Sequence, residues 1–304
     1  MKTAFIGAVE GSAVALRTLC EKGQSPDLVV TLPVELAGAH SDFADLGPLA
    51  ADYGLRLMRS PRSESDEVMA ALRQLQPDLV MIIGWSQLIG PGMIALPRLG
   101  VLGFHPSPLP RMRGRAVLPW QILTRQSQGG ATLFWIGEGV DDGPIAAQSV
   151  FTIDPDRITV RELYDKAVAE MACLLPPLVA DLAAGNRPAM PQNHENATIC
   201  ARRRAEDGMI DWSLPATEID RLIRAVGPPY PGATTRASKG AEVTITAARV
   251  HPREGYYIGL PGQIQNIDGQ IVTVMAGDGR CIDLLEWRGV ESFLRHEKLR
   301  GASC

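Results

Sequence analysis

The sequence predicts an α/β protein made of two parts, an open parallel sheet with helices followed by a smaller β-barrel. Short apolar runs alternate with helical patterns through the first half of the 304-residue chain, which is typical of βαβ units and a parallel sheet. Beyond residue 240, short apolar runs alternate with glycine turns, a pattern that suits a small barrel. The apolar content of 45% is enough to form one good core and a second, smaller one.

Each predicted element of the first part has a local signal. Apolar residues at helical spacing predict helices over residues 12–21, after a glycine turn, and over residues 65–75, before Pro77. Continuous apolar runs are typical of buried parallel strands. They predict five strands, over residues 3–6, 28–32, 78–83, 101–104 and 131–136.

A long helical pattern and a polar stretch mark the end of the first part. The helical pattern covers residues 159–184, is interrupted by Pro176 and Pro177, and ends at Gly185. We therefore expect a first domain at residues 1–185, a linker at 186–207 and a second domain at 208–304. In the second domain we expect one helix and four strands, over residues 217–226, 242–247, 262–267, 271–275 and 280–285.

Bulk charge and hydrophobicity argue against several classes of protein. The net charge of −4 gives no large basic field for nucleic acid. No apolar stretch reaches the roughly 20 residues that span a bilayer, and the first residues do not resemble a signal or transit peptide, so we expect a soluble, cytoplasmic protein. The cysteines have no spacing that suits zinc or a disulfide framework. We expect them to be reduced and structural, and we expect no metal site: Cys20, Cys173, Cys200, Cys281 and Cys304.

Two loops carry residue types suited to acid/base chemistry. The first, HPSPLPRMRGR at residues 105–115, begins with His105 directly after a predicted strand, where loops of open α/β sheets line the ligand crevice. The second, GEGVDDGPI at residues 137–145, offers two carboxylates between glycines. A carboxylate beside an imidazole orients the ring and favours its protonated form, so His105 and Asp141 would make an acid/base pair. A structural histidine and a simple DDG turn are the alternative from these residues alone.

The motifs around these loops resemble those of the 10-formyltetrahydrofolate-dependent formyltransferases. GVLGFHPSPLPRMRG, at residues 100–114, is similar to the family signature of Asn-x-His followed by Ser-Leu-Leu-Pro-x-x-Arg-Gly. GVDDG, at residues 139–143, is similar to the family's Gly-Leu-Asp-Thr-Gly loop. Further matches run colinearly along the chain: IIGWSQLI, MPQNHENAT, EDGMIDWSLPA and IRAVGPPYPGA.

The resemblance implies a fold, a formyl donor and a set of site residues. It implies a Rossmann-like formyltransferase domain, an OB-like C-terminal barrel, and 10-formyltetrahydrofolate as the donor. His105 and Asp141 would be catalytic, passing a proton from the attacking amine toward the leaving nitrogen, with Ser107 helping to fix the loop. Trp85 would either stack on the pterin or simply pack. The implied donor-binding residues are Ile83, Trp85, Gln87, Leu88, Leu109, Pro110, Arg113, Gly114, Val140 and Asp141.

Gly103 is the main departure from the family pattern. The family's catalytic Asn falls on this position, two residues before His105, and its amide is thought to stabilise an oxyanion. Loss of one such donor typically costs about 10²- to 10³-fold in rate. We expect another donor to take its place and Gly103→Asn to be tolerated. The alternatives are a pocket reshaped around the glycine and a folate-binding homologue that has lost catalysis.

The acceptor is predicted from a segment that differs from the tRNA-specific relatives. Those relatives carry a basic insertion after the second strand, whereas residues 33–53 contain no Lys or Arg and four acidic residues here, which would repel a phosphate backbone. RGRAVLPW and PPYPGA resemble the relatives that formylate amino sugars attached to nucleotides. We therefore expect a small amine, foremost a nucleotide-linked amino sugar, with another small amine and methionyl-tRNA as alternatives. We expect no membrane partner and leave a homodimer open.

Overall fold

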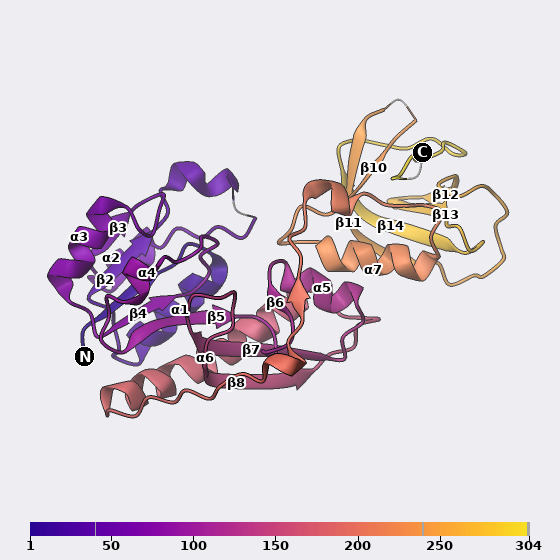
Figure 1. Cartoon of the computed structure of the whole chain (residues 1–304). Helices are drawn as coiled ribbons and strands as arrows, with labels where there is room; N and C mark the ends of the chain where they lie inside the picture. Colours follow the sequence, from indigo (N-terminus) through magenta and orange to yellow (C-terminus); the bar gives the residue numbers. More distant parts are fainter. Residues whose placement is uncertain (40, 239, 303–304) are drawn as a thin grey trace. The chain divides into compact units, whose positions relative to one another are not determined.

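The chain forms two units in a computed structural model that describes residues 1–39, 41–238 and 240–302 (Figure 1). The first unit comprises Met1–Val117, Gln128–Thr152 and Tyr164–Ala201, and the second comprises Leu118–Ser127, Ile153–Leu163 and Arg202–Cys304. The predicted boundaries at residues 185 and 207 stay predictions.

A seven-stranded sheet in the order β3-β2-β1-β4-β5-β7-β8 forms the first unit. Its elements are β1 (Thr3–Ile6), α1 (Glu10–Glu21), β2 (Leu28–Thr31), η1 (Val34–Ala39), α2 (Gly47–Asp52), β3 (Leu57–Arg59), α3 (Asp66–Leu75), β4 (Leu79–Ile82), α4 (Pro91–Ile94), β5 (Gly100–His105), β6 (Arg113–Gly114), β7 (Gln128–Trp135), β8 (Ile145–Thr152), most of α6 (Val160–Ala183), η2 (His194–Asn196) and β9 (Ile199–Cys200).

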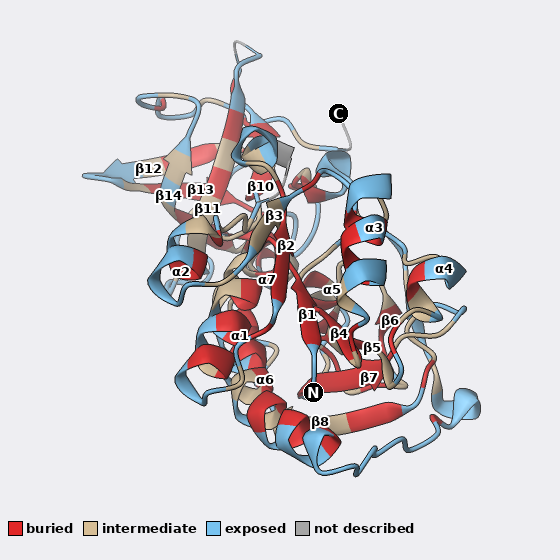
Figure 2. Ribbon diagram, turned by 90° about the vertical axis from the view of Figure 1, so that its left-hand side faces the viewer, coloured by how far each residue is buried: buried red, intermediate tan, exposed pale blue. Residues whose placement is uncertain are grey.

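The central strands of this sheet are buried because both faces are covered (Figure 2). Every residue of β1, β2 and β4 is buried, which explains their continuous apolar runs. On one face, side chains of these strands and of β5 form a core with α3 and α4. Ser65 caps α3 by accepting a hydrogen bond from the Val68 N–H, as expected of an N-cap serine.

The direction of the last two strands corrects the expectation of a fully parallel sheet. Strands β1 to β5 pair in parallel, but β7 runs antiparallel to β5, and β8 antiparallel to β7. A short loop joins β7 to β8, and such a connection produces antiparallel strands. The fold class is nevertheless confirmed as α/β with a mostly parallel central sheet.

The second unit contains a five-stranded antiparallel sheet in the order β10-β11-β14-β13-β12. The last segment of the chain forms bridges to both sides of this sheet, pairing Arg300 with Arg236 and Lys298 with Gln263, as suits the expected small barrel. The elements are α5 (Val117–Leu123), η3 (Ala205–Gly208), α7 (Ala216–Val226), β10 (Ala233–Arg236), β11 (Glu242–Val250), β12 (Ile264–Asp268), β13 (Ile271–Met275) and β14 (Cys281–Arg288).

Several local expectations were wrong. Helix α6 is one continuous helix that contains Pro176 and Pro177, so the prolines do not interrupt it. Short or partly exposed elements carried too weak a pattern for the sequence analysis, which missed α2, α4, α5, β3, β8 and β10. The polar stretch at residues 186–207 is also more ordered than a plain linker, because it contains η2, β9 and η3.

Within the described part of the chain, no helix is long and apolar enough to cross a membrane. The same residues contain no group of three or more His, Cys, Asp or Glu side chains that could hold a metal ion. Cys20, Cys173, Cys200 and Cys281 are free thiols. Cys304, and His40, to which the sequence assigned no role, lie outside the described residues.

Candidate active site

His105 is the last residue of β5 and is held from several sides. The ring is buried, and its Nε2 lies 2.7 Å from the Met112 carbonyl oxygen. A carbonyl only accepts hydrogen bonds, so Nε2 carries a hydrogen. Ser107 donates to the carbonyls of Arg111 (3.0 Å) and Met112 (3.2 Å), which fixes the loop as expected. The other ring nitrogen, Nδ1, is therefore the position where a proton can be gained or lost.

Asp141 faces that nitrogen, at 3.6 Å from Oδ2 to His105 Nδ1. This distance is too long for a hydrogen bond, but contacts of catalytic groups are often long without substrate. The Gly114 N–H donates to the same Oδ2 at 2.8 Å. Asp141 has a positive φ of 49°, a conformation that Asp adopts more readily than most residues.

The antiparallel direction of β7 determines how Asp141 reaches His105. The Ile136 N–H donates to Val101 O, four residues before His105 on β5. The loop after β7 therefore starts away from His105 and must fold back toward it. Gly143 permits this fold, because a Cβ there would collide with the Trp135 carbonyl oxygen.

Residues from the predicted linker hold both loops in place. The buried Gln192 side chain accepts from Arg113 Nε (3.1 Å) and from one of its terminal nitrogens (2.7 Å), and donates to the carbonyls of Asp141 (2.8 Å) and Gly143 (2.7 Å). Strand β9 pairs in parallel with β6, which lies in the loop at residues 105–115, called the His loop below. The sequence analysis missed Gln192, although it lies in the MPQNHENAT match.

A cavity of about 350 Å³ is lined in part by Asp141, whereas His105 is not among its lining residues. Side chains from the end of β4, from β5 and from β7 form mostly apolar walls, and the loop after β7 completes them. Its lining residues are Ile82, Gly84, Trp85, Gln87, Leu88, Ile89, Gly103, Phe104, Phe134, Ile136, Gly137, Glu138, Gly139, Val140 and Asp141. Apolar walls with a few polar groups are typical of small-molecule sites, and they suit a flat ring system such as a pterin.

Half of the predicted donor-binding residues line this cavity, namely Trp85, Gln87, Leu88, Val140 and Asp141. Trp85 also packs against the core, so its two alternatives are not exclusive, and its buried Nε1 has no hydrogen-bond partner in the described structure. The Gln87 side chain accepts a hydrogen bond from the Ser63 N–H and donates one to the Pro61 carbonyl.

The remaining predicted residues are not brought to the cavity wall. Ile83 is fully buried, and its carbonyl accepts a hydrogen bond from Ser12. Leu109 is buried and Pro110 is half-buried beside it in the His loop. Arg113 is buried against Gln192 and His194. Gly114 acts through its N–H on Asp141.

The space beside Gly103 is filled by hydrophobic side chains. Gly103 pairs with Phe134 across β5 and β7, and a Cβ at Gly103 would lie 2.9 Å from Phe134 Cε1 and 3.0 Å from Ile136 Cγ1. The Phe134 ring also meets the His105 ring edge-on, with centroids 6.5 Å apart. A side chain at this position therefore requires Phe134 or Ile136 to shift, which argues against the expected tolerance of Gly103→Asn.

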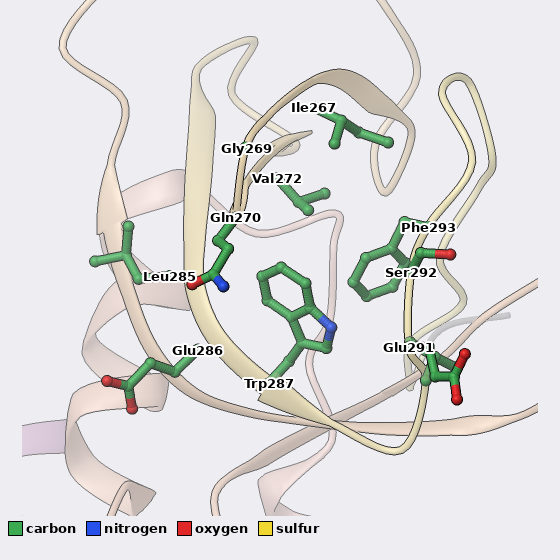
Figure 3. A pocket seen from close by; sticks show the side chains of 11 residues that line it. Ile267, Gly269, Gln270, Val272, Leu285, Glu286, Trp287, Glu291, Ser292 and Phe293 are labelled. Carbon is green, nitrogen blue, oxygen red and sulfur yellow. The ribbon is translucent and has the colours of Figure 1, made fainter.

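A second cavity, of about 440 Å³, lies in the second unit (Figure 3). Trp287 lies at its centre, with the Phe293 ring 5.3 Å away between centroids. Its charged lining residues are Glu286 and Glu291. Asp141, which lines the first cavity and faces His105, is not among its lining residues.

Two family models match most of the chain. One is described as "Formyl transferase" and covers residues 6–177, and the other as "Formyl transferase, C-terminal domain" and covers residues 203–291. A methionyl-tRNA formyltransferase of Symbiobacterium thermophilum is 33% identical over 285 residues, which cover 93% of this chain and 86% of the relative. A methionyl-tRNA formyltransferase of Agathobacter rectalis is 30% identical over 288 residues, covering 94% and 91%.

Solved structures share the fold at lower identity. WlaRD, a sugar 3N-formyl transferase crystallised with dTDP and 5-N-formyl-THF, has a TM-score of 0.66 and 17% identity, with 94% of this chain and 97% of that chain covered. The methionyl-tRNA formyltransferase from Clostridium thermocellum has a TM-score of 0.60 and 16% identity, covering 85% and 96%.

Proposed function

Because this chain belongs to the formyl transferase family, we propose that it passes a formyl group to a small amine with His105 and Asp141 as its catalytic residues. Membership confirms the resemblance found in the sequence, and the enzyme is a formyltransferase that uses 10-formyltetrahydrofolate. The observation that carries the proposal is the approach of Asp141 Oδ2 to His105 Nδ1 beside an apolar cavity.

The mostly apolar lining of the cavity supports binding of the donor there. Its pterin would lie against Trp85 and Leu88 on one side and against Val140 on the other, and the donor supplies the formyl carbon. Glycines 137 and 139 in the lining carry no side chains, which lets a ligand approach the backbone closely.

His105 would move the proton that the reaction displaces. A neutral amine becomes cationic when it attacks a carbonyl carbon, so a base must remove a proton from it. Nε2 is engaged with Met112 O, which leaves Nδ1 to take and return that proton. Asp141 stabilises the imidazolium formed in between, as an orienting carboxylate does in other acid/base pairs.

For the acceptor, we favour a nucleotide-linked amino sugar. The supporting observation is the segment at residues 33–53, which carries no basic residue in its sequence. Two of its carboxylates are engaged inside the unit: Asp45 pairs with Arg59 at 2.7 Å, and Asp42 accepts from Tyr164 at 3.3 Å. Glu35 and Asp52 remain exposed to oppose a phosphate backbone.

Methionyl-tRNA is the second candidate acceptor. It is favoured by the names of the relatives that are 30% to 33% identical, whereas the sugar-formylating proteins share the fold at 17% identity. The absence of basic residues at 33–53 is the observation against it.

An acceptor screen separates the candidates. Tetrahydrofolate production from 10-formyltetrahydrofolate would be followed with nucleotide-linked amino sugars, simple amines and initiator methionyl-tRNA. We expect turnover with an amino-sugar nucleotide. Efficient formylation of the tRNA, with binding that weakens steeply as salt increases, would replace the sugar proposal. Folate binding without turnover on any acceptor would indicate a binding protein instead.

A further inference from the structure

The Gln192 side chain links the two loops that carry His105 and Asp141. Its oxygen accepts two hydrogen bonds from Arg113 in the His loop. Its nitrogen donates to the carbonyls of Asp141 and Gly143 in the loop at residues 137–145, called the Asp loop here. An amide has two N–H donors and an oxygen that accepts two bonds, so its full capacity is used. Gln192 is 6% exposed, which leaves little competition from water.

From these contacts we infer that Gln192 is a positioning residue that sets the approach of Asp141 to His105. This inference rests on the proposed role of that pair. The Asp loop starts away from His105 and folds back, so the position of Asp141 depends on contacts made by the loop itself. Two hydrogen bonds hold the loop at Asp141, from the Gly114 N–H to the carboxylate and from the Gln192 side chain to the backbone carbonyl.

Arg113 fixes the orientation of the Gln192 amide group. Its guanidinium is buried, and its hydrogen-bond partners in the described structure are Gln192 and Nδ1 of His194. A guanidinium has donors and no acceptor, so it fixes the amide oxygen toward the His loop. The amide nitrogen must then point toward the Asp loop.

Two substitutions separate this role from general stability. Gln192→Met keeps the length of the side chain and removes all of its hydrogen bonds. Gln192→Glu keeps an acceptor for Arg113 and adds an ion pair, but it turns an oxygen toward the carbonyls of Asp141 and Gly143. Asn193→Asp is the matched control, since it makes the same charge change one residue later, is exposed, and keeps the oxygen that accepts from the Glu195 N–H.

The experiment combines steady-state kinetics with NMR spectra of the His105 ring protons in the full-length protein. We expect both Gln192 variants to lower kcat by about 10²-fold, the effect of a misplacement of about 1 Å, with KM for the donor little changed. The His105 ring-proton resonances should shift, because the carboxylate is no longer held beside Nδ1. Asn193→Asp should match the wild type in both measurements.

Wild-type kcat and unmoved His105 ring-proton resonances in a folded Gln192→Glu or Gln192→Met variant would overturn the inference. A lower melting temperature with unchanged kcat per folded molecule would do so too, because the role would then be structural. If the wild type shows no turnover with any of the acceptors tested, the proposed function fails. The NMR arm still decides on Gln192, since it requires no acceptor.

Discussion

Replacing Gly103 with the asparagine of the family pattern tests how this site is packed. A Cβ at this position would lie 2.9 Å from Phe134 Cε1 and 3.0 Å and 3.1 Å from two atoms of Ile136. Optimal carbon–carbon separations are about 3.5–4.0 Å, so even the first added atom overlaps both side chains. Phe134 is 5% exposed, and both Phe134 and Ile136 line the first cavity, so their displacement would change the space proposed for the donor.

We expect Gly103→Asn to destabilise the first unit and to lower turnover. Overpacking a well-packed site costs about 1–3 kcal/mol, and each kcal/mol lowers the melting temperature of a domain of this size by about 2–4 °C. Turnover should fall as well, because the Phe134 ring that must move contacts the His105 ring. Thermal melting and steady-state kinetics measure the two effects.

A double variant tests the cause. Phe134→Ala alone should cost about 3–5 kcal/mol because it leaves a cavity. In Gly103→Asn/Phe134→Ala the asparagine occupies part of that cavity, so the double variant should be more stable than the sum of the single effects by about 0.5–3 kcal/mol. Gly103→Asn with wild-type melting and turnover would refute the reasoning, as would strictly additive effects.

Two further predictions concern the catalytic pair and the thiols. His105→Ala and Asp141→Ala should each lower turnover by about 10²-fold or more while leaving folate binding, measured by titration, largely intact; near-normal turnover of either variant would remove that residue from the mechanism. Burial and the nearby carboxylates Asp283 and Asp278 raise the pKa of the Cys281 thiol to about 11, so at pH 8 it should stay protonated and resist alkylation until the protein unfolds, whereas exposed Cys173 should react. Mass spectrometry of the labelled peptides measures both, and rapid native labelling of Cys281 would contradict its buried placement.

The sequence predicted the buried strands well because their pattern depends on burial alone. Strands β1, β2, β4 and β5 lie within a residue or two of their predicted positions, since strands covered on both faces read as continuous apolar runs. Strand β8 was missed because its residues are half exposed or alternate weakly. Strand direction was also misjudged at β7, because an apolar run does not specify the direction of its neighbour.

The site was only partly predictable for a related reason. His105 and Asp141 could be identified because each lies in a recognisable motif. In the structure His105 Nδ1 lies 3.6 Å from Asp141 Oδ2. Gln192 and Phe134 act through contacts between segments distant in sequence, which no local pattern encodes. Arg113 carried a motif signal, but its side-chain partners lie about 80 residues later, at Gln192 and His194.

These contacts explain how a site built from loops can be held accurately. Met112 and Asp141 both have positive φ, a conformation that costs free energy for residues other than glycine. Segment 192–200 supplies hydrogen bonds that offset this cost, since Gln192 holds Asp141 and Thr198 Oγ1 accepts from the Met112 N–H at 2.8 Å. The stretch that the sequence presents as a linker is therefore part of the scaffold of the proposed site. Substitutions there should be judged by their effect on His105 and Asp141 rather than as changes in a spacer.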